Sequence, residues 1–187
     1  MKQIALALLA LSSSLMALEN AGQKWVEKTK KSYWTAQEKI ITGENPDKKN
    51  SVLWTDKKFK DFELIIKFKT DSKDYDSGIF LRGNSHQVQI GVSRSLKKDL
   101  TACIYAPVDK KGKYPAASDQ IAELHKLGKW NEMKITVKGK NIQVLLNGTQ
   151  TVNYDGVKIK EQGPIGLQLH AGVHQKMEFE IISLKEL

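Results

Sequence analysis

Apolar and polar residues alternate with a period of two over most of this chain. Between residues 62 and 69, Phe62, Leu64, Ile66 and Phe68 occupy every second position, the pattern of a strand with one face in a core. The same alternation predicts further strands over 79–82, 86–92, 133–137, 142–146, 165–170 and 177–184. A mostly β fold is therefore expected.

Two turn signals join three of these strands into a meander. Gly139-Lys140-Asn141 separates one pair of alternating segments, and Asn147-Gly148 separates the next, because Asn and Gly tolerate the positive φ angles of tight hairpins. Many short strands with little helical periodicity predict an all-β antiparallel β-sandwich of the jelly-roll kind. Two segments differ: residues 19–31 have some helical character, and residues 107–127 are expected to be irregular.

The first residues are interpreted as a cleaved signal peptide over 1–17. Lys2 precedes an apolar stretch over 4–11, and small residues follow near Ala17, which is the usual order of a secretory signal. The apolar stretch is shorter than the roughly 18 residues that span a bilayer, and no later segment is apolar enough to do so. We expect one domain over 18–187, exported to the periplasm or secreted.

The net charge narrows the list of partners. The chain has 187 residues with 30 Lys and Arg against 21 Asp and Glu, which gives a formal net charge of +9. Lysine pairs such as Lys57-Lys58 and Lys97-Lys98 are scattered instead of gathered on one reading element, so no nucleic-acid partner is expected. Attraction to acidic glycans is the weaker interpretation of this charge. The single Cys103 is expected to be a small buried side chain without a chemical role.

Several hydrogen-bonding side chains lie out of phase with the apolar core positions. They are amides, a guanidinium and an imidazole instead of the Lys and Glu found elsewhere: Arg82, Gln87, Gln89, Gln168 and His170. Such groups suit a polyhydroxylated ligand, and Tyr105, Trp54 or Trp130 can provide a flat surface for a sugar ring. A carbohydrate ligand is expected, with an ordinary solvent-facing sheet as the alternative.

Spacing alone predicts no metal site. His170 and His174 are four residues apart, but Gly172 between them indicates a loop instead of a ligand-bearing helix. Three aspartates lack the spacing and closing Glu of a calcium loop and are interpreted as a turn: Asp71, Asp74 and Asp76. No cofactor is predicted, although a divalent metal at His170 stays open. Phosphate-binding loops and nucleophile elbows are also absent from the sequence.

A series of short motifs resembles one family. In chain order they are Leu53-Trp54-Thr55, Asp61-Phe62-Glu63-Leu64, Asp76-Ser77-Gly78-Ile79-Phe80-Leu81-Arg82, Val88-Gln89-Ile90, Trp130-Asn131, Leu146-Asn147-Gly148 and Gly163-Pro164-Ile165-Gly166-Leu167-Gln168. This order is similar to the 3-keto-disaccharide hydrolase domain family over nearly all of the chain after the signal. The resemblance implies a concanavalin A-like, laminin G-like jelly roll and action on glycosides oxidised at C3.

The resemblance also implies roles for particular residues. Arg82 matches the Arg of the family's Ser-Gly-Ile-x-Leu-Arg motif and would hold the ketone or a hydroxyl. His170 matches the family's His after Gly-Leu-Gln and would act as a base, an acid or a metal ligand. The expected contacts to substrate hydroxyls are Gln87, Gln89, Gln168 and Tyr105.

Three positions depart from the family pattern. His86-Gln87 stands where the family has Tyr-Glu, Leu169 where it has Asp, and Phe179-Glu180 where it has Phe-Arg. Glu180 is expected to contact substrate. Because an amide cannot act as a base, one hypothesis is that Glu180 supplies, from a neighbouring strand, the carboxylate that Gln87 lacks. Three interpretations stay open: a hydrolase or lyase of 3-keto sugars, a non-catalytic carbohydrate-binding or envelope-interaction module, and a sandwich that mediates protein contacts.

Overall fold

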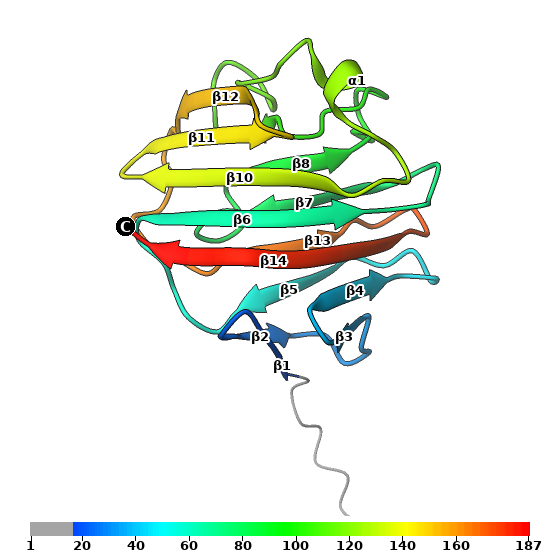
Figure 1. Ribbon diagram of the computed structural model, residues 1–187. Helices are drawn as coiled ribbons and strands as arrows, with labels where there is room; N and C mark the ends of the chain where they lie inside the picture. The colour runs from blue at the N-terminus through cyan, green and yellow to red at the C-terminus, as the bar shows by residue number, and fades with distance from the viewer. Residues whose placement is uncertain (1–16) are drawn as a thin grey trace, which may run out of the picture.

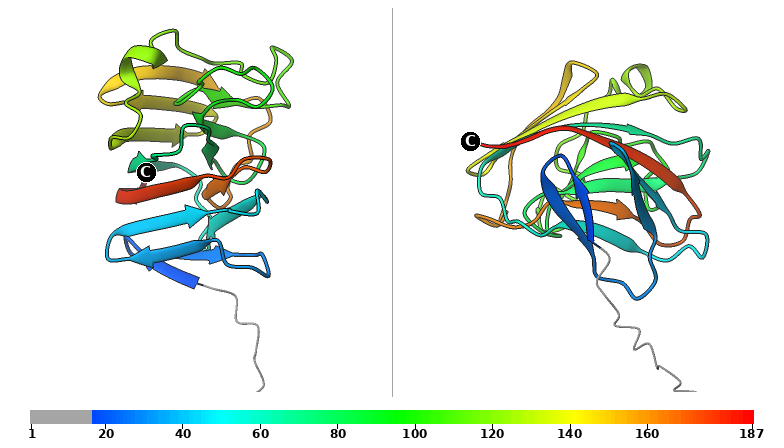
Figure 2. Two further views of the ribbon diagram at one scale, coloured as in Figure 1. Left: turned by 90° about the vertical axis from the view of Figure 1, so that its right-hand side faces the viewer. Right: turned by 60° about the horizontal axis from the view of Figure 1, so that its bottom comes forward.

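Two antiparallel sheets pack face to face in the computed structural model, which describes residues 17–187 (Figures 1 and 2). In spatial order, sheet A contains β1 (Ala17–Asn20), β2 (Gln23–Glu27), β5 (Ser51–Thr55), β13 (Gly166–Leu169), β7 (Asp76–Phe80), β8 (Gln87–Gly91) and β9 (Ile104–Tyr105). Sheet B contains β12 (Thr149–Asp155), β11 (Asn141–Leu146), β10 (Asn131–Lys138), β6 (Phe62–Lys69), β14 (Lys176–Glu186), β4 (Ile40–Glu44) and β3 (Trp34–Gln37). The predicted antiparallel β-sandwich is confirmed.

The core lies between the two sheets, where the period-two alternation predicts it. In β6 the residues Phe62, Leu64 and Ile66 are fully buried, while the side chains between them are half-buried. Ile79 and Val88 enter the same core from sheet A. Each large apolar side chain buried in this way contributes about 1.5–3 kcal/mol relative to its exposed state. The core is therefore the main source of stability.

Cys103 is free and fully buried, as expected from its apolar surroundings. Burial raises the pKa of its thiol, which keeps it protonated and unreactive. The residues described thus contain no disulfide, and packing has to hold the two sheets together.

Both predicted hairpins are present in sheet B. β10 pairs with β11 across the Gly139-Lys140 turn, and β11 pairs with β12 across Asn147-Gly148. Asn147 and Gly148 have φ angles of +50° and +85°, the left-handed conformations that such a turn requires. The three strands form the expected meander.

The helical character expected for residues 19–31 is wrong. This segment contains most of the β1–β2 hairpin, which reverses at Ala21 and Gly22, both with positive φ. Trp25 is fully buried, and the buried carboxylate of Glu27 accepts a 2.6 Å hydrogen bond from Ser51 Oγ. In the sequence, the buried carboxylate of Glu27 cannot be told from a polar residue on the surface. The strand alternation of this segment is therefore not visible in the sequence.

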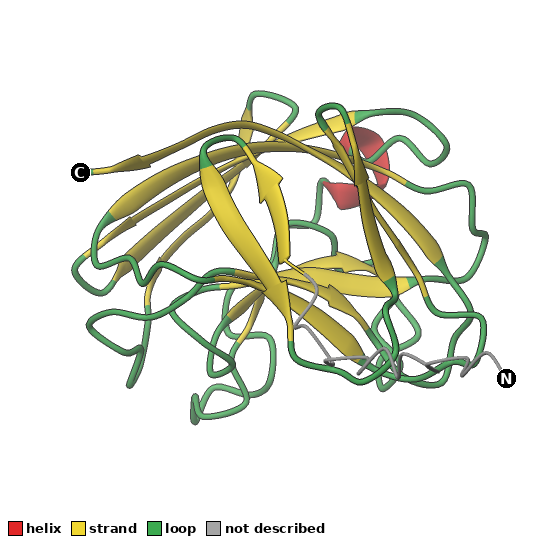
Figure 3. Cartoon of the chain, turned by 90° about the horizontal axis from the view of Figure 1, so that it is seen from below, coloured by secondary structure: helices red, strands yellow, loops and turns green. Residues whose placement is uncertain are grey.

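Outside the sheets, the structure is mostly irregular, as expected for residues 107–127. The short helix α1 (Ile121–Leu124), red in Figure 3, interrupts this segment and lies at the top of the sandwich in Figure 1. Among residues 17–187, none of the helical structure is long and apolar enough to cross a membrane. The signal peptide predicted over 1–17 lies, except for its last residue, outside the described residues.

Candidate functional site

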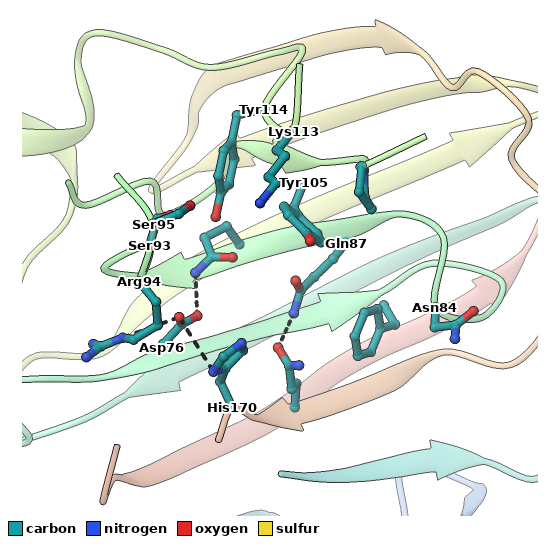
Figure 4. A pocket seen from close by; sticks show the side chains of 14 residues that line it. Asp76, Asn84, Gln87, Ser93, Arg94, Ser95, Tyr105, Lys113, Tyr114 and His170 are labelled. Atoms are coloured by element: carbon teal, nitrogen blue, oxygen red, sulfur yellow. Dashed lines mark hydrogen bonds and ion pairs between the residues drawn. The ribbon is translucent and has the colours of Figure 1, made fainter. Parts of the chain in front are cut away.

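A pocket of about 470 Å³ lies on the face of sheet A that points away from sheet B (Figure 4). Its volume is within the range of roughly 300–1,000 Å³ typical of small-ligand sites. The strands contribute the side chains that alternate with core positions: Asp76, Phe80, Gln87, Gln89, Tyr105 and Gln168. Loops contribute Asn84, Ser93, Arg94, Ser95, Pro107, Lys113, Tyr114 and His170.

Three of the predicted glutamines meet in this pocket because Gly78 leaves room between them. Gly78 pairs with Gln168 on one side and Gln89 on the other, and a Cβ atom on Gly78 would lie 2.2 Å from Gln87 Nε2. The Gln87 side chain therefore crosses over Gly78 and donates from Nε2 to Gln168 Oε1 at 2.5 Å. Gln168 Nε2 in turn donates to Asn50 Oδ1 at 3.3 Å. The acceptor that Gln87 can offer a ligand hydroxyl is its Oε1.

Asp76 is the carboxylate among the lining residues, and the turn interpretation of its segment is wrong at this position. It is the first residue of β7, and its side chain is 7% exposed. Oδ1 accepts a 2.8 Å hydrogen bond from Gln89 Nε2, and Oδ2 lies 3.5 Å from Arg94 Nε. Asp76 is in phase with Gly78 and Phe80, so the alternation of β7 would have located it.

Two buried amide side chains fix the position of Asp76. The Gln175 amide accepts from Asp76 N at 2.9 Å and donates to Asp76 O at 2.7 Å. Asn45 accepts from Gln175 N at 3.1 Å and donates to His170 O at 3.0 Å. These contacts join residues far apart in sequence, so no local pattern identifies Asn45 or Gln175 as supports of the site.

His170 lies beside Asp76 at the open side of the pocket, with its side chain 42% exposed. Its Nδ1 is 3.9 Å from Asp76 Oδ2 and 2.7 Å from the carbonyl oxygen of Ala171. A carbonyl oxygen can only accept, so neutral His170 carries its hydrogen on Nδ1 and its lone pair on Nε2. Nε2 is therefore the atom that can take a proton from a ligand.

Two tyrosines form another side of the pocket. The rings of Tyr105 and Tyr114 lie 5.3 Å apart with their planes tilted by 56°. Burial raises the pKa of the Tyr114 phenol, so it stays protonated at neutral pH and can donate a hydrogen bond. In Figure 4 its hydroxyl and the ammonium of Lys113 both point into the pocket. Sequence reasoning found Tyr105 but missed Tyr114 and Lys113, which belong to an irregular loop.

The structure does not bring Arg82 to this pocket. Alternation places Arg82 on the same face as Phe80, but β7 ends at Phe80 and Arg82 adopts a φ of +54°, which turns the side chain away. Its fully buried guanidinium donates to Asp61 Oδ1 at 2.9 Å and to the carbonyl oxygens of Gly139 and Lys160 at 2.6 and 3.1 Å. These contacts join loops at one end of the sandwich.

Glu180 is also remote from the pocket. It lies on β14 in sheet B, where it pairs with Lys67 and Ile40, and it lines a separate groove together with Glu19. Because Gln87 belongs to sheet A, the prediction that Glu180 supplies the missing carboxylate beside it is wrong. In this pocket the carboxylate comes from Asp76.

The two tryptophans considered as sugar platforms do not line the pocket. The Trp54 ring covers Gly166 and stacks on Phe80 at 5.4 Å and 18°, so it supports a lining residue from the side. Trp130 has the Lys69 ammonium 5.5 Å above its ring. Tyr105 is the predicted aromatic residue that reaches the site.

Among residues 17–187, no three His, Cys, Asp or Glu side chains are grouped as a metal site would require. His174 pairs with Glu44 at 3.0 Å instead of approaching His170 as a second ligand. The pocket chemistry available from the residues is hydrogen bonding and proton transfer.

A model of the 3-keto-alpha-glucoside-1,2-lyase-like domain matches residues 15–185. A crystal structure named "Putative glycosyl hydrolase" from Parabacteroides distasonis ATCC 8503 has a TM-score of 0.62 and 23% identity, with 82% of this chain and 90% of that chain covered. No match was found among curated proteins.

Sugar-binding proteins share the same architecture. The carbohydrate-binding module CBM66 from Bacillus subtilis has a TM-score of 0.58 at 9% identity, covering 95% of this chain and all of that one. The VIP36 exoplasmic/lumenal domain, solved with Ca²⁺ and Man3GlcNAc, has a TM-score of 0.57 at 11% identity and covers 87% and 85% of the two chains. At these identities the similarity shows the fold: a two-sheet sandwich like those of lectins and carbohydrate-binding modules.

Proposed function

The chain belongs to the 3-keto-alpha-glucoside-1,2-lyase-like domain family, and from this membership we propose that its pocket cleaves the glycosidic bond of a C3-oxidised sugar. One observation carries the proposal: His170 lies beside the buried Asp76 carboxylate in a pocket lined by three glutamines and two tyrosines. This set combines a proton acceptor with many hydrogen-bonding groups for sugar hydroxyls.

The reaction is an elimination. The ketone at C3 acidifies the proton on C2, so a base can remove it and leave an enolate across C2 and C3. The electron pair then re-forms the C3 carbonyl while a C1–C2 double bond forms and the bond from C1 to the leaving oxygen breaks. The leaving oxygen takes a proton, and addition of water to the double bond turns the overall reaction into hydrolysis.

Each proton has a residue that can carry it. His170 Nε2 takes the C2 proton, and the charged imidazole returns it to the leaving oxygen. Asp76 stabilises the positive charge that His170 gains between these steps. The protonated Tyr114 hydroxyl is the donor for the enolate oxygen. Arg82, which the family motif suggested for the ketone, has no part because its guanidinium is bound to Asp61.

Turnover of a 3-keto glucoside with a chromogenic leaving group tests the proposal. His170→Ala is expected to lower release by at least about 100-fold, since positioned acid–base groups typically contribute that much. His174→Ala is the matched control, because this histidine is exposed, pairs with Glu44 and does not line the pocket. A His170→Ala variant as active as the wild type would refute the role of His170. The same assay with a chelator tests whether His170 requires a divalent metal for turnover.

A second function is favoured by the amide at position 87. The chain of amides from Gln87 through Gln168 to Asn50 binds hydroxyls but cannot transfer protons. A non-catalytic carbohydrate-binding module would show saturable sugar binding by calorimetry and no chromogenic release from the 3-keto glucoside. Release that depends on His170 excludes this alternative.

We also propose that the protein acts in the periplasm or outside the cell, following the signal peptide expected over residues 1–17. N-terminal sequencing of the protein from the envelope and medium fractions is expected to begin near Leu18. An intact N-terminus on protein recovered from the cytoplasm would contradict export.

A further inference from the structure

Two loops that frame the pocket are cationic on their outer side. The loop over 92–103 carries exposed Lys97 and Lys98, and the loop over 106–120 carries exposed Lys110 and Lys111. Both loops also contribute lining residues to the pocket. Charges of one sign at the rim of a cleft raise the local concentration of ligands of the opposite sign.

The same loops carry three carboxylates: Asp119 is exposed, and the other two are bound to groups of the sandwich or of their own loop. Asp99 Oδ2 lies 2.7 Å from His125 Nδ1, and Asp99 Oδ1 accepts a 2.7 Å hydrogen bond from Thr101 Oγ1. Asp109 is buried and accepts a 2.6 Å hydrogen bond from the Tyr154 hydroxyl. Asp99 and Asp109 are therefore engaged in contacts that fix their loops, while the four lysines and Asp119 are exposed, which leaves an excess of positive charge on the outer side of the two loops.

Among the residues that line the pocket, one carboxylate, Asp76, stands against two cations, Arg94 and Lys113. Arg94 pairs with Asp76 and also with Asp74, which does not line the pocket. Among residues 17–187, Lys113 takes part in no ion pair. Its ammonium points into the pocket in Figure 4. A neutral sugar can offer this exposed ammonium hydrogen bonds, whereas an anionic sugar can also offer it an opposite charge.

We propose that the pocket selects a glycoside carrying an anionic group, which binds the Lys113 ammonium. The inference rests on the proposed function, since it takes the pocket to be the sugar site, and it adds the substrate class. A lysine is a compact point charge without the fixed fork of an arginine, so a carboxylate and a sulfate on the sugar both satisfy it.

Calorimetry with three defined probes tests this selection: methyl β-D-glucoside, methyl β-D-glucuronide and glucose 6-sulfate. The anionic probes are expected to bind about tenfold more tightly than the glucoside at low salt, since charge-assisted hydrogen bonds are the strong ones. The preference should fall as salt is added. If both anionic probes bind tightly, the site takes anionic sugars in general. If only the glucuronide binds tightly, the site takes uronates.

Variants show whether Lys113 is responsible. Lys113→Gln is expected to bring the glucuronide to within about twofold of the glucoside, whereas Lys138→Gln is expected to leave the preference intact. Lys138 is also an exposed lysine, at the end of β10 in the other sheet. Equal binding of neutral and anionic probes, or a preference that survives Lys113→Gln, overturns the inference.

Chromogenic turnover separates failure of this inference from failure of the proposed function. If the probes bind equally while His170-dependent release persists, only the anionic selectivity is wrong. If the protein binds none of the probes and releases no chromophore from the 3-keto glucoside, the sugar site itself is wrong, and the selectivity is overturned with it.

Discussion

Two glycines determine how side chains lie on the outer face of sheet A. A Cβ atom at Gly78 would clash with Gln87, and one at Gly166 would lie 2.7 Å from the Trp54 ring. Each glycine thus gives a neighbouring strand's side chain room to cross the sheet. Gln87 uses this room to reach Gln168, and Trp54 uses it to stack on Phe80.

Gly78→Ala is expected to weaken sugar binding about fivefold, because the new methyl group displaces Gln87 from its hydrogen bond, worth about 1 kcal/mol. Calorimetry on the variant measures this loss. The control is the same substitution in a Gln87→Ala background, where the methyl group has space. If Gly78→Ala weakens binding equally in both backgrounds, the effect does not pass through Gln87.

The sequence predicts which face of a sheet a side chain occupies only within segments where apolar and polar residues alternate. Gln87, Gln89 and Gln168 share the pocket because each is out of phase with core residues of its own strand. By the same alternation Arg82 would face the pocket, but β7 ends at Phe80, two residues earlier than the sequence indicates, and Arg82 has a positive φ. Gln175 supports the site through long-range contacts, for which a single sequence holds no signal.

At the scale of elements, Arg82 links three loops through hydrogen bonds from its guanidinium. Its guanidinium connects the loop before β6, through Asp61, to the β10–β11 turn at Gly139 and to the segment at Lys160. Asp61 also accepts from Gly139 N at 2.9 Å. One ion pair, between the buried Arg82 guanidinium and the partly exposed Asp61 carboxylate, therefore holds three connections of the sandwich together.

Arg82→Met is expected to lower the free energy of unfolding by about 3 kcal/mol, because it removes the guanidinium's three hydrogen bonds, to Asp61, Gly139 and Lys160. Chemical denaturation measures the change, with Arg82→Lys as a milder variant that keeps the charge. Chromogenic release per folded molecule is expected to stay at the wild-type level. A folded Arg82→Met protein that binds sugar but has lost release would return Arg82 to the catalytic machinery.

Elements could be predicted where one face of a strand is apolar and the other polar. β6, β10 and β11 fit that condition, and Asn147 and Gly148 fix the hairpin turn between β11 and β12. The β1–β2 hairpin does not fit, because Glu27 turns a charged group toward the interior and pairs it with Ser51. A partner on another strand was needed to interpret that position.

At the scale of the whole molecule, buried His86 couples stability to pH. It is fully buried, its Nδ1 lies 3.0 Å from Ser85 Oγ, and its Nε2 finds no hydrogen-bond partner among the described residues. Burial lowers the pKa of His86, although the charge of Asp109 opposes this change. The folded protein therefore holds His86 neutral at pH values where the unfolded chain protonates it.

The free energy of unfolding is expected to fall as the pH drops below about 6.5, where the unfolded state begins to bind a proton that the native state excludes. Denaturation between pH 7 and pH 5 measures this slope. His86→Leu is expected to reduce it, while His174→Leu, at an exposed histidine, should leave it unchanged. A His86→Leu variant with the full wild-type slope would show that other groups produce it.

The position of β14 in sheet B affects when the protein can complete its fold during synthesis. β14 lies between β6 and β4, and Phe179 pairs with Phe68 on one side and Ile41 on the other. Until residue 186 has been synthesised, the two earlier strands lack the strand that joins them. Because such distant pairings close slowly, the nascent chain completes its fold only after synthesis of this region. Until β14 is in place, β4 and β6 each have an open edge at which another chain can pair, so the unfinished sandwich is prone to aggregation.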